Sequence, residues 1–309
     1  MKTVMSNKLF GMFALLLVAQ TGLAQRSSFY KFEVGGGLGM SNYLGEIGGK
    51  EKTERPFVWD MKLNQTRWAV GGYARYKMSN YLSVRADLIY GRIQGADSLS
   101  DNRGRVGRNL SFRNDLLEFS GRAEVYMYNT NDVGGKGWYR VDFKSYVFAG
   151  IGGVLHGPKA LHNGEWVKLR PLTTEGVNYG RVTATMPIGV GFFFTYKRRH
   201  RFGWEMGWRM TFTDYLDDIS GVYADPSMLP NATSIALANR SDELTDAQRP
   251  HIANYAPGQK RGDSNDNDTY FFTTFTYGYV FRGKNPFYTQ HYSWLGGRKG
   301  RRTISRVKF

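Results

Sequence analysis

The sequence predicts an all-β protein: an eight-stranded antiparallel transmembrane β-barrel with long extracellular loops and a basic periplasmic C-terminal tail. Three observations lead to this prediction. Apolar and polar residues alternate along eight segments, the links between these segments alternate between short and long, and the chain begins with an export signal. Such features are typical of bacterial outer-membrane barrels, in which each strand has one face toward lipid and one toward a polar lumen.

Residues 1–24 carry the export signal. Two lysines precede an apolar run at residues 9–19, and the small residues Gly22 and Ala24 precede a cleavage point before Gln25. This pattern indicates a secretory signal peptide whose apolar core is too short to span a membrane. No later stretch approaches the roughly 20 apolar residues of a spanning helix. A mature chain located in a membrane must therefore cross it as a closed barrel, which we place at residues 25–281.

Composition limits the chemistry and the partners. The chain of 309 residues contains no cysteine, which excludes disulfides, thiolate nucleophiles and cysteine-ligated metals. Its formal net charge of +16 favours anionic partners, such as the phosphates of lipopolysaccharide or an acidic protein surface. We expect no nucleic-acid partner, because no nucleic-acid-binding motif is present and the predicted compartment is the cell envelope.

The segment at residues 202–213, FGWEMGWRMTFT, shows the alternation most clearly. Its even-numbered residues are Phe, Trp, Met, Trp, Met and Phe, whereas its odd-numbered residues are Gly, Glu, Gly, Arg, Thr and Thr. One apolar face and one face of small and charged residues suit a wall between lipid and lumen. The same alternation predicts strands at residues 29–40, 68–78, 82–90, 117–127, 143–156, 186–196, 202–213 and 271–281.

The links support the barrel independently. They are short or rich in turn-forming residues after the second, fourth and sixth strands, and long after the first, third, fifth and seventh. Barrels of the outer membrane have short periplasmic turns and long outer loops, so both chain ends are predicted to be periplasmic. A soluble lipocalin-like barrel is the alternative, but it would place its apolar face inward around a ligand.

The assigned faces predict a charged lumen. Ten ionisable residues should point inward, namely Lys31, Arg75, Arg85, Arg122, Arg209, Glu33, Asp87, Glu118, Glu124 and Glu205. Five basic and five acidic groups suggest a balanced network of ion pairs. Because an eight-stranded barrel has room for side chains but not for a water-filled channel, we expect this network to fill and rigidify the lumen.

Evidence for catalysis is weak. None of the five histidines lies four residues from another, and no HExxH motif occurs. His156 and the three acids Asp214, Asp217 and Asp218 fall near the predicted outer rim, where a carboxylate–imidazole pair would act as a general base. A rim-active hydrolase or acyltransferase is thus one alternative. The sequence GDSNDND at residues 262–268 resembles half a calcium loop without its closing Glu, so no metal or cofactor is predicted.

The segment after the last strand, residues 282–309, is basic and contains no acidic residue. It is either a solvated arm near lipid phosphates or peptidoglycan, or a docking peptide with aromatic anchors and a basic rim. We predict docking, because aromatic residues such as Phe287, Tyr288, Tyr292 and Trp294 are unexpected in a purely solvated tail. The predicted partner-binding residues are Phe287, Tyr288, Tyr292, Trp294, Arg298, Lys299, Arg301 and Arg302 of the tail, with Lys197, Arg198, Arg199 and Arg201 of the third short turn.

Two segments resemble a known family. SNYLGEIGG at residues 41–49 and TDYLDDISGVYAD at residues 213–225, together with the eight strands and the basic tail, resemble the PorG-like outer-membrane barrels of the type IX secretion system. The resemblance implies a non-enzymatic component associated with a periplasmic ring of the PorK lipoprotein and PorN. It also implies a role in export of proteins bearing the type IX signal and, in gliding bacteria, in motility. A free-standing barrel for adhesion or envelope stability is the other alternative.

Both segments follow strands that flank the last strand in a closed barrel. We therefore predict that Glu46, Asp214, Asp217 and Asp218 meet near one rim and form a structural clasp with an arginine.

Overall fold

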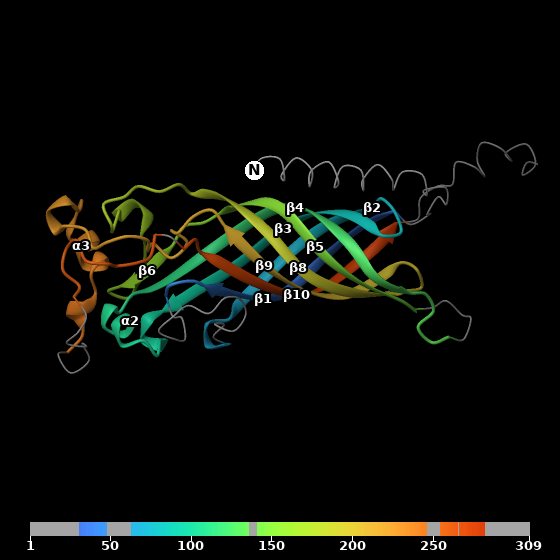
Figure 1. The fold of residues 1–309 in the computed structure, drawn as a ribbon, viewed down its shortest axis with the longest axis horizontal. Helices are drawn as coiled ribbons and strands as arrows, with labels where there is room; N and C mark the ends of the chain where they lie inside the picture. The colour runs from blue at the N-terminus through green and yellow to red at the C-terminus, as the bar shows by residue number, and fades with distance from the viewer. Residues whose placement is uncertain (1–30, 48–62, 136–140, 246–253, 265, 282–309) are drawn as a thin grey trace, which may run out of the picture. The chain divides into compact units, whose positions relative to one another are not determined.

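The wall of the protein is a closed barrel of eight strands (Figure 1). The structure is a computed structural model that describes residues 31–47, 63–135, 141–245, 254–264 and 266–281, and Glu33–Val280 form one compact unit. The eight strands are β1 (Phe32–Leu44), β2 (Arg67–Lys77), β3 (Leu82–Ala96), β4 (Ser111–Thr130), β5 (Val141–Leu155), β8 (Val182–Tyr196), β9 (His200–Thr211) and β10 (Thr269–Phe281). They pair in the order β3-β2-β1-β10-β9-β8-β5-β4, and antiparallel pairing of β3 with β4 closes the ring.

The long links lie at one end of the barrel and hold the remaining elements. The hairpin of β6 (Lys159–His162) and β7 (Glu165–Lys168) continues the wall through a pairing of β6 with β4. Two short helices, α2 (Arg103–Arg108) and α3 (Ala232–Ala238), stand at the same end (Figure 1). Five 3-10 turns complete the described elements: Leu63–Gln65, Asp97–Leu99, Arg170–Leu172, Pro226–Met228 and Ser241–Glu243. We call this the long-loop end, and the opposite one the short-turn end.

Helices do not provide a membrane span in the described part of the chain, since none is both long and apolar enough.

The eight predicted strands are all present, and some are longer than predicted. β3 continues to Ala96 and β4 begins at Ser111, so the two strands stay paired well beyond the predicted segments. In this extension Arg92 lies opposite Asp115, and the two form an ion pair of 2.6 Å. The sequence analysis did not predict this extension, because it searched for strands with an apolar outward face and the extension carries polar residues.

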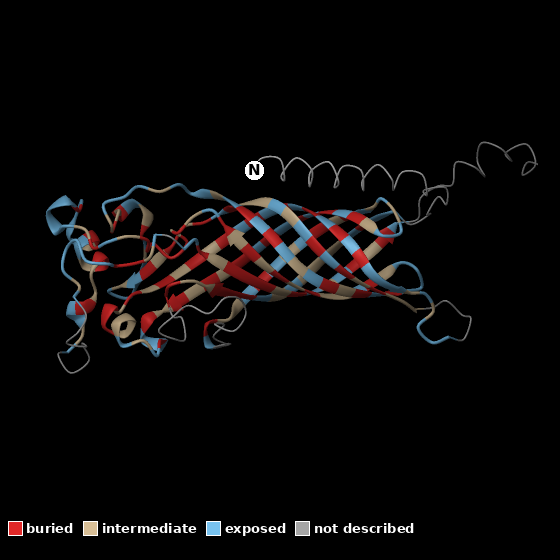
Figure 2. Cartoon of the chain, in the orientation of Figure 1, coloured by how far each residue is buried: buried red, intermediate tan, exposed pale blue. Residues whose placement is uncertain are grey.

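Burial alternates along the strands (Figure 2). Large apolar side chains stand exposed on the outer wall, for example Leu38, Phe119, Met127, Ile151 and Phe275. Phe271 was predicted to face lipid, but its side chain is buried. An apolar belt of this extent is unfavourable in water and is the surface that a lipid bilayer covers.

Ion pairs fill the part of the lumen nearer the short-turn end. Arg75 binds Glu33 at 2.9 Å and Glu124 at 2.7 Å, and Glu205 accepts hydrogen bonds from Arg85, Arg122 and the Tyr146 hydroxyl. Nine of the ten predicted inward residues are buried, namely Arg75, Arg85, Arg122, Arg209, Glu33, Asp87, Glu118, Glu124 and Glu205. The tenth, Lys31, is exposed because it precedes β1.

Apolar and aromatic layers fill the rest of the lumen. Four rings pack together beside the ion pairs: Tyr126, Tyr146, Phe148 and Phe193. Toward the long-loop end, a larger cluster joins wall residues such as Ile93 and Phe272 to loop residues such as Leu216. Inward glycines make room for these rings, since a Cβ atom on Gly189 would lie 2.5 Å from the Phe148 ring. The described side chains therefore pack the lumen as a core, as expected for a barrel of this size.

Candidate functional site

Two arginines tie the four long loops together. Arg108, at the end of α2 in the β3–β4 loop, forms a two-pronged ion pair with Asp97 at 2.8 and 3.0 Å. It also lies 3.5 Å from Glu46 of the β1–β2 loop and donates to the carbonyl of Arg261 at 2.6 Å. Each of these groups is buried, so the bonds are made out of contact with water.

Arg261, from the β9–β10 loop, makes the second set of contacts. Its guanidinium donates to Glu175 of the β5–β8 loop at 2.8 Å, to the carbonyl of Asp218 at 2.7 Å and to the carbonyl of Ala238 at 3.2 Å. Glu175 also accepts from the backbone N–H groups of Ser220 and Gly221. Arg108 and Arg261 thus connect all four loops, and we call this set of contacts the clasp.

The four predicted rim residues all lie within or beside the clasp. Glu46 accepts from the backbone N–H of Asp263, and Asp218 accepts from the hydroxyls of Thr174 and Tyr179. Asp217 accepts from the Tyr43 hydroxyl at 2.8 Å. No local pattern predicts the roles of Arg108 and Arg261, because both lie in loops whose spatial neighbours are distant in sequence.

A group of buried acids adjoins the clasp. The Tyr43 hydroxyl contacts both Asp217 and Asp268, although one hydroxyl has only one proton to donate. The second carboxyl forms a hydrogen bond of its own to this oxygen only when it carries a proton itself. Burial raises the pKa of Asp217 and of Asp268 well above the usual range. Repulsion from Asp268 raises the pKa of Asp217 further, and repulsion from Asp214 raises that of Asp268.

Asp214, a neighbouring acid, has a strongly raised pKa. Burial raises its pKa to about 9; the Ser220 hydroxyl opposes the shift, and Asp217 and Glu46 add to it. Burial also raises the pKa of Asp218 to about 6, a smaller change because the Arg261 guanidinium favours the carboxylate. The folded long-loop end therefore binds more protons than the unfolded chain at neutral pH.

This proton uptake predicts that alkaline pH weakens the long-loop end. An acid whose pKa is raised on folding destabilises the fold progressively as pH rises from its unfolded value, near 4, toward its folded value. We expect the urea midpoint for protection of the loops from protease to fall between pH 5 and pH 9. In Asp214→Asn the free energy of loop opening should decrease less with pH than in the wild type, by up to about 1.4 kcal/mol per pH unit. Asp225→Asn is the control, since Asp225 is exposed and its pKa is lowered by Ser227. Equal slopes in all three proteins would contradict the assignment.

His156 does not form the pair that a rim enzyme would need. Its ring stacks on Tyr179 with centroids 6.2 Å apart, and within the described residues its Nδ1 atom has no hydrogen-bond partner. Burial lowers its pKa to about 4. No group of three or more His, Asp or Glu side chains in the described ranges is arranged to hold a metal ion.

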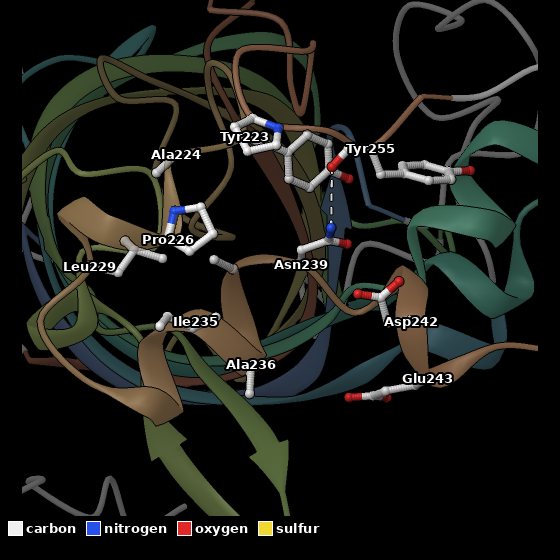
Figure 3. Close-up of a pocket in the computed structure, with 12 residues that line it drawn as sticks. Tyr223, Ala224, Pro226, Leu229, Ile235, Ala236, Asn239, Asp242, Glu243 and Tyr255 are labelled. Atoms are coloured by element: carbon white, nitrogen blue, oxygen red, sulfur yellow. Dashed lines mark hydrogen bonds between the residues drawn. The ribbon is translucent and has the colours of Figure 1, made fainter.

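A cavity of about 370 Å³ opens within the β9–β10 loop (Figure 3). Leu229, Ile235 and Pro226 form an apolar side, and Asp242 and Glu243 stand on another. Tyr223 and Tyr255 lie above them, where the carbonyl of Tyr255 accepts a hydrogen bond from Asn239 at 3.2 Å. Sequence reasoning did not find this cavity, because loop residues with no periodicity form it.

The predicted basic surface at the short-turn end is only partly where we placed it. Lys197, Arg198 and Arg199 are exposed in the turn between β8 and β9, and the first two have positive φ angles of 49° and 60°. Arg201 differs: it points into the barrel, pairs with Glu33 and is 9% exposed. The alternation of β9 explains this, because Arg201 shares the inward face with Glu205. The eight predicted tail residues lie outside the described residues.

Comparison with known proteins gives a family and a fold. Residues 7–229 match the model of a family described as Domain of unknown function (DUF6089). No curated protein matches the chain. Three similar solved structures are OprG of Pseudomonas aeruginosa, Ail of Yersinia pestis and the N-terminal β-barrel domain of OprF of Pseudomonas aeruginosa. Their identities are 11%, 10% and 10%, and their TM-scores are 0.37, 0.34 and 0.33. The matches cover 84%, 81% and 82% of this chain and 100%, 99% and 98% of the other chains. The architecture follows from this chain's own strand pairing.

Proposed function

The chain belongs to the DUF6089 family, and we propose that it is a non-enzymatic outer-membrane barrel that anchors a periplasmic assembly of the type IX protein-secretion machinery. The observation that carries this proposal is the filled lumen. Ion pairs and aromatic rings occupy it, and the clasp covers its long-loop end. Because the interior offers no passage or open site in the described residues, function falls to the two ends of the barrel.

The short-turn end is the one that suits a periplasmic partner. Outer-membrane barrels have their short turns in the periplasm, so this end would face a ring of PorK-like lipoprotein and PorN-like protein. The exposed turn of Lys197, Arg198 and Arg199 supplies positive charge there, and the basic residues of segment 282–309 follow the last strand. The residues at 41–49 and 213–225 that resemble PorG-like barrels support the same function.

A pull-down from detergent-solubilised membranes tests the proposal. We expect the full-length protein to capture the ring components and a protein truncated after Arg282 to lose them, with barrel folding checked by heat-modifiable gel mobility. Capture by both proteins would move the docking surface to the short turns. If neither captures the ring, the secretion role is wrong.

Adhesion is the second candidate, and the cavity at the long-loop end favours it. Its apolar side suits an extracellular ligand with an apolar body. Loss of attachment, with secretion intact, in cells lacking the protein would select this candidate over the secretion role.

A further inference from the structure

Three cationic side chains enter the lumen at the short-turn end. Lys77 is the last residue of β2 and shares the inward face of Arg75, and Lys144 lies near the start of β5 on the inward face of Tyr146. Arg201 enters from the start of β9. Because the three come from separate strands of the ring, they surround the mouth of the barrel, and we call them the mouth cations.

Two of the mouth cations have no ion-pair partner among the described residues. Lys144 is 8% exposed, and its Nζ atom lies 4.8 Å from the centre of the Tyr126 ring. Lys77 and Arg201 are the positive charges that act on it most strongly, whereas Asp142 is the carboxylate that offsets them. Among the described residues neither lysine ammonium group forms an ion pair or a hydrogen bond, and Asp142 itself accepts from the backbone N–H of Asp132.

The carboxylate that pairs with the third mouth cation cannot neutralise the two lysines as well. Arg201 pairs with Glu33, and Glu33 is already shared with Arg75. Burying an ammonium group without an anion costs free energy, and a second cation nearby increases the cost. The mouth therefore holds excess positive charge that an added anion would neutralise.

Apart from Asp132 and Asp142, the segments that adjoin the short-turn end in sequence supply no acidic side chain. Residues 1–30, 136–140 and 282–309 contain no Asp or Glu. Lipid phosphates would surround the outer wall, whereas the mouth cations point toward the barrel axis. Lys144 and Arg201 lie over the Tyr126 and Phe193 rings, which are themselves buried.

We propose that the mouth of the barrel binds a carboxylate side chain from an acidic segment of a periplasmic protein. The site deepens the proposed function, on which it rests, by assigning the chemistry of the partner: a Glu or Asp that inserts between Lys77, Lys144 and Arg201. Charge-assisted hydrogen bonds to two ammonium groups would give the contact its strength.

A peptide-binding measurement tests the site. The probe is a fluorescein-labelled hexaglutamate peptide, with hexaglutamine and inorganic phosphate as comparisons, titrated onto full-length protein folded in detergent. We expect Lys77→Gln/Lys144→Gln to weaken hexaglutamate binding at least about tenfold. Lys168→Gln/Arg181→Gln removes the same charge from exposed residues toward the long-loop end and should leave binding unchanged. The mouth variant should also unfold at an equal or higher urea concentration, because it removes two cations that repel each other.

Other outcomes overturn the site. If both double variants lose hexaglutamate binding equally, only the net charge of the protein matters. If only Lys197→Gln/Arg198→Gln/Arg199→Gln loses binding, the contact lies on the turn. Tighter binding of phosphate than of hexaglutamate would assign the mouth to a phosphate group. Ring capture separates the two proposals: a wild-type protein that captures the ring without binding hexaglutamate disproves the mouth site alone. A protein that binds hexaglutamate without capturing the ring disproves the secretion role.

Discussion

Replacing Glu205 with Leu is expected to destabilise the barrel by about 3–5 kcal/mol. The Glu205 carboxylate accepts from Arg85 at 2.9 Å and from Arg122 at 2.5 Å, and it is 2% exposed. Its removal leaves two guanidinium groups facing each other inside the barrel with only Asp87 and Glu124 nearby. Urea titration of the folded barrel, followed by heat-modifiable gel mobility, measures the loss.

Two further variants identify the cause. Glu165→Gln removes an acidic residue from the exposed β7 and should change stability by less than about 0.5 kcal/mol. Glu205→Leu/Arg122→Leu restores the charge balance, so it should recover much of the stability, since replacing a whole buried ion pair is often nearly neutral. If the double variant is no more stable than Glu205→Leu, the loss comes from packing and the ion-pair explanation is wrong.

The barrel was predictable from sequence because its wall imposes a period of two. Any residue of β9 that faces outward requires its neighbour to face inward, so FGWEMGWRMTFT specifies both faces at once. The same rule predicts Glu33 and Arg75 in the lumen, where the two form an ion pair. The prediction that Arg201 belongs to the turn surface is wrong, because Arg201 follows the alternation of β9 and not the exposure of its basic neighbours.

The site was less predictable, because loops carry it. Glu46 and Asp217 stood out through their segments, but their partners Arg108 and Tyr43 lie far away in sequence and have no repeated pattern. Asp268 illustrates the difficulty: its acidic segment suggested half a calcium loop, whereas in the fold it accepts from the backbone N–H of Leu216 at 2.8 Å. Such contacts depend on how the ring closes, which no local periodicity reports.

Arg261 should hold the long loops closed, so Arg261→Gln is expected to open them while leaving the strands intact. The change removes bonds to Glu175 and to the carbonyls of Asp218 and Ala238, and leaves the buried Glu175 carboxylate without its cation. Breaking a buried pair from one side costs about 3–5 kcal/mol. If that cost falls on local opening of the loops, protease should cut the β9–β10 loop about 10²–10⁴ times faster. The urea midpoint of the barrel itself should change little, because the lumen network is untouched.

The matched control is Arg240→Gln in the same loop. Arg240 pairs with Glu243 three residues along the chain, and Glu243 is substantially exposed, so the loss of this pair should cost at most about 1 kcal/mol. Arg261→Gln/Glu175→Gln removes the stranded carboxylate and should slow the cutting again, which distinguishes an unpaired charge from lost packing. Arg261→Lys keeps the charge but not the planar donor geometry that reaches three acceptors, so its cutting rate should lie between those of wild type and Arg261→Gln. Cutting at the wild-type rate in Arg261→Gln would show that the clasp does not restrain the loops.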